Sequence, residues 1–147
     1  MRGIIAEAHF DHGRNFVAML KVRPALPSRA QPSRYAARLI QPTASQGKKR
    51  YILLPPESCK DVYMYPRSHP EGRHSSVDWS NPEVIAAEKY PHFKDARALE
   101  EVLVEGEVLY IPHMWIHYIV SLETNVQCNA RSGNSMKGML EAKECGF

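Results

Sequence analysis

The chain has 147 residues, of which 44% are hydrophobic and 24% charged, and its formal net charge is +3. This length suits one domain, and the composition is ordinary for a globular protein. No apolar run reaches the roughly 18 residues of a transmembrane helix, so no membrane partner is expected. The three cysteines, Cys59, Cys128 and Cys145, form no Cys-x-x-Cys motif. A zinc site is therefore not expected, and the default prediction is a reduced, intracellular protein of the cytoplasm or nucleus.

Histidine and aspartate near the start of the chain suggest a metal site. His9 and Asp11 stand two positions apart, and His117 follows about a hundred positions later. Side chains at i and i+2 of a strand share one side, about 6.5 Å apart, so His9 and Asp11 could both point into a barrel. Two histidines and a carboxylate are the ligand set that holds Fe(II) on one face. His12 and His113 are alternative ligands by residue type, and surface-loop positions are the alternative for the whole set.

Segment 22–46 differs from the rest of the chain, because it holds four prolines, four arginines and no acidic residue. Its arginines supply +4, so the remaining residues carry −1, and the basic balance argues little for nucleic acid. Without this segment, 17–21 would continue into 47–54 as a tight hairpin with a Gly turn. A long loop without secondary structure is unusual inside a compact domain.

Two explanations of segment 22–46 remain open. It begins with Val22, whose codons start with GT, and ends with Gln46, which CAG encodes. These are the borders of a spliceosomal intron, so we interpret the segment as a translated intron that the mature protein lacks. The alternative is a genuine, disordered basic loop that contacts a partner.

Later elements are predicted from local signals. Asn81 as N-cap and Pro82 at the first helical position predict a short helix over 82–90. The second half carries short strands with brief turns, typical of an all-β barrel or sandwich. These strands cover 102–104, 108–111, 118–122 and 126–129. The tail 132–147 is predicted to be a frayed helix or disordered.

Several motifs in a fixed order carry a family resemblance. They are Ala-His-Phe-Asp at 8–11, Arg-Asn-Phe-Val-Ala-Met-Leu at 14–20, Arg-Tyr-Ile-Leu-Leu-Pro-Pro at 50–56, the Pro- and His-rich stretches within 65–93, Val-Glu-Gly-Glu-Val-Leu-Tyr-Ile-Pro at 104–112, Trp-Ile-His at 115–117, and 125–129. Together they resemble the Jumonji-C (cupin-like) oxygenases, most closely the branch of the asparaginyl hydroxylase that inhibits hypoxia-inducible factor. The resemblance covers most of 6–133.

The resemblance implies a mostly-β fold, the double-stranded β-helix or cupin barrel, with a short helix in an insertion between strands. The barrel domain would occupy 1–133, and 134–147 would be a C-terminal tail. Because few residues precede His9, we expect the barrel to be incomplete at its N-terminus, with an exposed sheet edge. The chain would then be a fragment or a truncated gene product.

The resemblance also assigns roles to residues. It implies that His9, Asp11 and His117 bind Fe(II) and are catalytic. It implies that Lys49 holds the distal carboxylate of the cosubstrate 2-oxoglutarate, in a pocket lined by Asn15 and Asn129. A solvated basic cluster is the alternative for Lys49, and both asparagines could instead satisfy backbone groups.

Five positions need separate comment. Ala6 stands where the family often has a hydroxyl residue, and Arg131 stands where an aromatic residue is common. Trp115 is predicted to be a packing residue. Arg73, with Asp78, is predicted to form a local pair in a structural cap over the barrel, with a substrate-side lid as the alternative.

The function implied is an Fe(II)- and 2-oxoglutarate-dependent dioxygenase, of the hydroxylase or demethylase type, acting on a protein side chain. A nucleic-acid substrate is the alternative. A second hypothesis is a truncated, non-catalytic cupin module that binds metal or a partner, and a third is a metal-dependent isomerase or small-molecule cupin. The sequence determines neither the substrate nor the oligomeric state.

Overall fold

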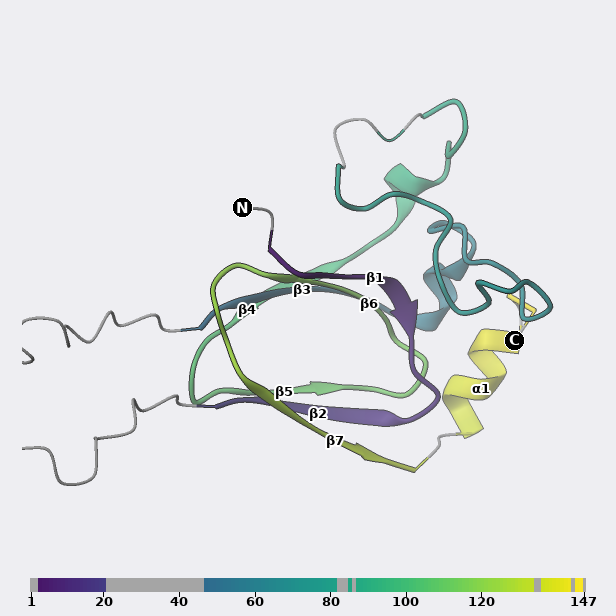
Figure 1. The fold of residues 1–147 in the computed structure, drawn as a ribbon. Coiled ribbons are helices and arrows are strands. Elements are labelled where there is room, and N and C mark those ends of the chain that lie inside the picture. The colour runs from purple at the N-terminus through teal and green to yellow at the C-terminus, as the bar shows by residue number, and fades with distance from the viewer. Residues whose placement is uncertain are drawn as a thin grey trace, which may run out of the picture.

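Two antiparallel sheets face each other in the computed structural model, which describes residues 3–20, 47–81, 85, 87–133, 136–143 and 145–146 (Figure 1). One sheet has four strands in the order β1-β6-β3-β4, and the other has three in the order β5-β2-β7. The strands are β1 (Ile5–Phe10), β2 (Arg14–Met19), β3 (Lys49–Leu54), β4 (Leu99–Leu103), β5 (Val108–Ile111), β6 (Ile116–Ser121) and β7 (Gln127–Ser132). The predicted mostly-β, cupin-type class is confirmed.

Two apolar cores lie on opposite faces of the four-stranded sheet. One fills the space between the sheets, with Tyr51, Leu53 and Val17 among its buried members. The other lies under the segment that follows β3, and it includes Ile116 and Tyr118 from β6. Because side chains alternate along a strand, the intervening residues of β6 point the other way, toward the second sheet.

A β-bulge interrupts the pairing of β1 with β6. Ala6 pairs with Ile119 and His9 pairs with His117, so three steps along β1 match two steps along β6. The extra residue lets Ala6 and His9 face the same side, although three positions separate them. The bulge therefore adds a second β1 residue to the inner face of the barrel.

The predicted hairpin between β2 and β3 is wrong, because these strands belong to different sheets. Their ends nevertheless lie close together. The Leu20 amide donates to the carbonyl of Val126 at 2.8 Å. Gly47 packs so tightly on Asn125 that a Cβ there would lie 2.5 Å from the Asn125 Cβ. The connection thus crosses between the sheets, and segment 22–46, with its two explanations, lies outside the described residues.

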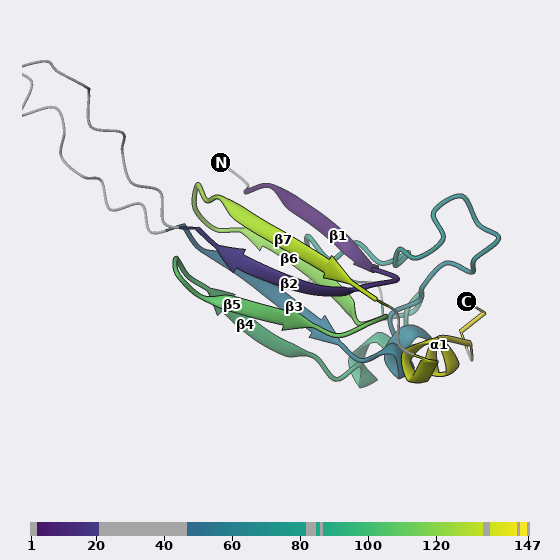
Figure 2. The ribbon, with the colours of Figure 1, turned by 90° about the horizontal axis from the view of Figure 1, so that it is seen from below.

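Helical elements gather at one end of the sheets, as the view from below shows (Figure 2). The described ones are the 3-10 helices η2 (Pro56–Cys59) and η4 (Phe93–Asp95), and helix α1 (Met136–Lys143). The helix predicted over 82–90 lies partly outside the described residues, and 87–89 forms a turn. Helix α1 lies within the predicted tail and packs on η2. None of the described helices is long and apolar enough to cross a membrane.

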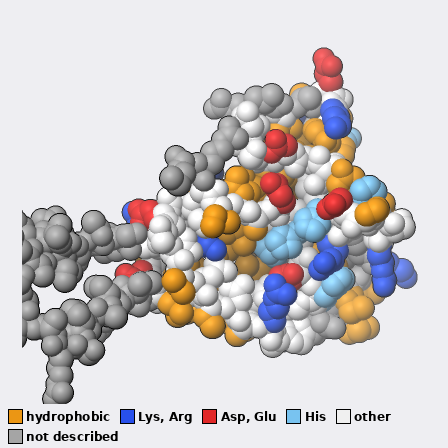
Figure 3. Space-filling model, viewed as in Figure 1, with side chains coloured by type: hydrophobic (Ala, Val, Ile, Leu, Met, Phe, Trp, Pro, Cys, Tyr) orange, Lys and Arg blue, Asp and Glu red, His pale blue; other side chains and the backbone are white. Residues whose placement is uncertain are grey.

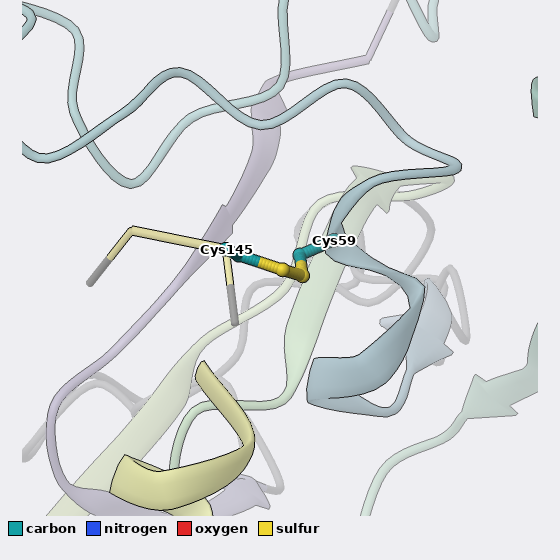
Figure 4. Close-up of a disulfide and its surroundings, with 2 residues drawn as sticks. All are labelled: Cys59 and Cys145. Carbon is teal, nitrogen blue, oxygen red and sulfur yellow. A yellow bond between two sulfur atoms is a disulfide. The ribbon is translucent and has the colours of Figure 1, made fainter. Parts of the chain in front are cut away.

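A disulfide joins Cys59 of η2 to Cys145, beyond the end of α1 (Figure 4). The two Cα atoms lie 6.1 Å apart, although 86 positions separate the residues. Cys128 is free and exposed. This differs from the reduced state expected from the sequence, because spacing gives no sign that the tail folds back beside η2.

Candidate metal centre

Strand β1, at the edge of the four-stranded sheet, and its neighbour β6 bring the predicted ligands together. His9 of β1 lies opposite His117 of β6. Asp11 follows directly after the last residue of β1, and its carbonyl accepts a hydrogen bond from the Met114 amide at 3.2 Å. One ligand atom from each of His9, Asp11 and His117 lies within 4.8 Å of the others. Metal–ligand bonds near 2.1 Å would hold such atoms about 3 to 4 Å apart, so small side-chain movements suffice to close the site.

Backbone carbonyls orient both imidazole rings. The Nδ1 atom of His9 lies 2.7 Å from the Glu7 carbonyl oxygen, and that of His117 lies 3.0 Å from the Trp115 carbonyl oxygen. A carbonyl only accepts, so Nδ1 carries the proton in each ring and Nε2 is left with its lone pair. The Nε2 atom of His117 faces Asp11 Oδ2 at 3.9 Å. Such a bond from the second ring nitrogen is what fixes the tautomer of metal-ligating histidines.

The Asp11 carboxylate is held by two neighbours besides the histidines. Asn15 donates to Oδ2 at 2.6 Å, and the Arg131 guanidinium lies 3.2 Å from the same oxygen. Burial by itself raises the pKa of Asp11, but the hydrogen bond from Asn15 and the charge of Arg131 help to outweigh it, so the pKa lies below its ordinary value. The carboxylate is therefore ionised, as a metal ligand must be.

His117 is the most deeply buried of the three, with 3% of its side chain exposed. Burial, followed by the nearby charge of His9, lowers the pKa of His117 to about 4. The neutral imidazole, which is the metal-binding form, is thus the form that the fold favours near neutral pH.

One cavity of about 210 Å³ between the sheets, the metal cavity, collects every residue predicted for the metal and cosubstrate. Three come from the metal set, and three from the set assigned to 2-oxoglutarate. They are His9, Asp11, His117, Lys49, Asn15 and Asn129. The roles themselves remain predictions, but residues far apart in sequence do converge on one small space.

Lys49 contributes an ammonium group to the metal cavity without a carboxylate partner among the described residues. Its Nζ atom donates to Gln127 Oε1 at 2.6 Å, and the Tyr51 hydroxyl donates to the same oxygen at 3.1 Å. Gln127 in turn donates to Asn129 Oδ1 at 2.9 Å. Burial lowers the pKa of Lys49 and raises that of Tyr51 to about 12. A cation held by a neutral amide in a desolvated place favours an anionic ligand.

The two departures from the family pattern both line the metal cavity. Ala6 offers only a methyl group there, and Arg131 pairs with Asp11. Gln127 is the residue that sequence reasoning missed. The signal that could have found it is the alternation of polar side chains at 127, 129 and 131, which a strand places on one face.

The alternative ligands His12 and His113 lie elsewhere. They line a second cavity of about 530 Å³, the basic pocket, together with Arg67, His69, Pro70, Gly72, Arg73, Met114 and Met139. The predicted pair between Arg73 and Asp78 does not form: Asp78 accepts hydrogen bonds from Ser80, and Arg73 lines this pocket. Trp115 packs against the core between the sheets, as a packing residue would.

A family profile described as a cupin-like domain matches residues 43–130 of the chain. The match includes Lys49, His117 and Asn129. It does not reach His9 or Asp11, whose assignment rests on the motif and on the geometry given above.

Curated relatives match parts of the chain. The human protein named tRNA wybutosine-synthesizing protein 5 is 38% identical over 92 residues, which is 62% of this chain and 25% of that protein. The rat protein named HSPB1-associated protein 1 is 35% identical over 81 residues, which is 53% of this chain and 16% of that protein. The matched region thus spans a quarter or less of the length of these relatives. Neither name is that of the asparaginyl hydroxylase to which the motifs pointed.

Proposed function

The chain belongs to the cupin-like domain family, and from this premise we propose that it is an Fe(II)- and 2-oxoglutarate-dependent dioxygenase domain of the Jumonji-C type. One observation carries the proposal. Two histidines with Nδ1 bound to backbone carbonyls and one ionised aspartate bring their ligand atoms within 4.8 Å of one another inside a cavity. This is the donor set that suits a non-haem Fe(II) oxygenase.

His9, Asp11 and His117 would hold the iron at the wall of the metal cavity, which they line together. When bound, the iron supplies the site for dioxygen activation, coupled to decarboxylation of 2-oxoglutarate to succinate. Asn15 keeps Asp11 oriented by its hydrogen bond to Oδ2. Arg131 balances the carboxylate charge from the rim.

Lys49 would bind the distal carboxylate of 2-oxoglutarate. It lies in the metal cavity with no carboxylate partner among the described residues, so an anion arriving there would not have to displace an existing ion pair. Gln127 and Asn129 line the same wall and would align the carboxylate through their hydrogen-bond chain. Ala6 offers no hydrogen bond, so we expect weaker cosubstrate binding than a hydroxyl residue would give.

The substrate is proposed at the level of its class. The sequence resemblance points to a protein side chain, and the name HSPB1-associated protein 1 describes a relative that associates with a protein. The name tRNA wybutosine-synthesizing protein 5 favours a tRNA substrate as the second candidate. Hydroxylation and demethylation are both within this chemistry, and kinship with the asparaginyl hydroxylase branch stays a prediction.

Anaerobic Fe(II) titration of the full chain tests the metal site. We expect one iron per chain, lost in Asp11→Ala. Asp95→Ala is the matched control, because Asp95 also faces a histidine, His92, at 3.6 Å, but on an exposed surface. Equal iron binding by Asp11→Ala and the unmodified chain would refute the proposed ligand set.

Succinate formation tests the reaction. The iron-loaded chain with 2-oxoglutarate and oxygen should release succinate slowly without its substrate, and His9→Ala should abolish this. A chain that binds one iron and 2-oxoglutarate but makes no succinate would support the non-catalytic metal-binding module instead.

A further inference from the structure

The basic pocket lies beside the metal ligands, because the amide of Met114 in its lining donates to the Asp11 carbonyl at 3.2 Å. Its cavity of about 530 Å³ is more than twice as large as the metal cavity. Histidine side chains gather on the face seen in Figure 3, with Lys and Arg side chains next to them. None of the roles assigned above to the metal or to 2-oxoglutarate uses this pocket.

Its described lining is cationic. Its charge comes from two arginines, three histidines add imidazole groups, and no carboxylate lines it; these polar members are Arg67, Arg73, His12, His69 and His113. Among the described residues, neither guanidinium has a carboxylate partner. The nearby Glu71 carboxylate faces His74 instead, at 4.0 Å from Nδ1.

Two of the histidines have ring nitrogens available for a ligand. The Glu71 amide donates to His69 Nδ1 at 3.0 Å, so the ring proton of neutral His69 is on Nε2, which is a donor. His113 is buried, with 5% exposed, and its Nδ1 has no partner among the described residues. A buried polar atom without a protein partner is rare in native proteins, and His113 lines the basic pocket.

The wall of the basic pocket is joined directly to the metal ligands. The Arg73 carbonyl accepts from the Phe10 amide at 3.2 Å, next to His9 and Asp11. Arg73 and Met114 both line the pocket with left-handed backbone, at φ 78° and 64°. Such conformations cost of order 1–3 kcal/mol and are kept where surrounding structure or function requires them.

We propose that the basic pocket binds a phosphate group carried by the substrate and so places the substrate beside the iron. Guanidinium groups bind phosphate oxygens in a bidentate manner, and the Nε2–H group of His69 adds a single donor. The pocket has room for a phosphate and the part of the molecule that bears it. The link to catalysis rests on the function proposed above, whereas phosphate binding itself does not.

Titration of the metal-free full chain with inorganic phosphate, followed by calorimetry and ³¹P line width, tests the pocket. Iron is omitted because phosphate would bind it. We expect one site, weakened about tenfold or more in Arg67→Gln and in Arg73→Gln, since each removes a charge-assisted hydrogen bond. Arg97→Gln is the matched control, because Arg97 is exposed and does not line the pocket. Glycerol phosphate should bind at least as well as free phosphate if the group arrives on a larger molecule.

Three results would overturn the proposal. The first is the absence of saturable phosphate binding. The second is a loss of phosphate affinity in Arg97→Gln, or in chloride at the same ionic strength, that is as large as the loss in the pocket variants. The third is loss of phosphate binding in Lys49→Gln but not in the two pocket variants. The last would place the anion in the metal cavity. Iron affinity, measured separately in Arg67→Gln, should be unchanged. If the chain binds phosphate as expected but binds no iron, the phosphate site is supported and the dioxygenase proposal is refuted.

Discussion

The metal cavity and the basic pocket lie side by side, and they differ in how their charged groups are partnered. In the metal cavity, Asp11 is held by Asn15 and Arg131, and Lys49 is held by Gln127. In the described lining of the basic pocket, the guanidinium groups have no carboxylate partner. In the metal cavity, the neighbouring side chains hold the candidate ligands in place, and the remaining volume suits a metal ion and a small carboxylic acid. The basic pocket presents free positive charge to whatever enters from outside.

Replacing one histidine in the metal cavity and one in the basic pocket should give the largest difference in Fe(II) affinity. We expect His117→Ala to weaken Fe(II) binding by more than about 100-fold, because even groups that only support a metal ligand contribute 10- to 100-fold. His12→Ala should leave iron affinity unchanged, since His12 lines the basic pocket. Anaerobic titration measures both. Iron loss in His12→Ala would mean that the ligand set was assigned to the wrong histidine.

Adjacent lysines separate a cosubstrate contact from a surface ion pair. Lys49→Ala should weaken 2-oxoglutarate binding about 10- to 100-fold, because a hydrogen bond to a charged group contributes about 1.5–3 kcal/mol. Lys48→Ala should have little effect, because Lys48 pairs with Glu123 on the surface at 3.5 Å. Calorimetry with iron replaced by a redox-inert divalent metal gives both affinities. Similar losses of 2-oxoglutarate affinity in the two variants would show that the lysines act only through their overall positive charge and that Lys49 makes no specific contact.

Acid should weaken the metal-free protein through His117. Burial and His9 hold the folded-state pKa of His117 near 4, below the ordinary value of 6.5. The fold thus prefers neutral His117, and this contribution is fully present above pH 6.5 and is lost as the pH falls toward 4. Urea unfolding at pH 7 and pH 5 should show a smaller free energy of unfolding at pH 5. In His117→Asn the pH dependence should be shallower, and an unchanged dependence would assign it to other groups.

A hydroxyl at position 6 should improve the metal cavity. The bulge turns Ala6 toward this space beside His9, so Ala6→Thr would add a donor there. We expect 2-oxoglutarate to bind a few-fold more tightly, in line with about 1 kcal/mol for an ordinary hydrogen bond. Ala6→Val, which has nearly the same shape and no hydroxyl, is the control. Equal affinities of the two variants would mean that position 6 does not reach the cosubstrate.

Removal of 22–46 should have the smallest effect. Leu20 and Gly47 contact the consecutive residues Val126 and Asn125, so Lys21 alone should suffice to join them. Loop length changes stability only slowly, by about 0.6 kcal/mol per doubling. We expect the shortened chain to fold with similar stability and to bind iron as before, as thermal unfolding and titration would show. A large loss of stability would favour a genuine loop that the fold requires.

The sequence predicted most of the strands because short apolar runs are bounded by Pro, Gly and charged residues. Strand β5 was predicted at its observed limits, 108–111. The ligand candidates His9, Asp11 and His117 also came from the sequence, because the residue types and the order of motifs carry that information. The short helix expected over 82–90 was the weakest local prediction, since 87–89 forms a turn.

What the sequence could not supply is long-range placement. Only the pairing of β1 with β6 decided that His9 and not His12 meets His117, and only the bulge brought Ala6 onto the same face. The fold also placed β2 and β3 in separate sheets and brought the tail back beside η2. Residue type and alternation are local properties, whereas register, bulges and the meeting of distant segments are decided by how the two sheets pack against each other and against the segments around them.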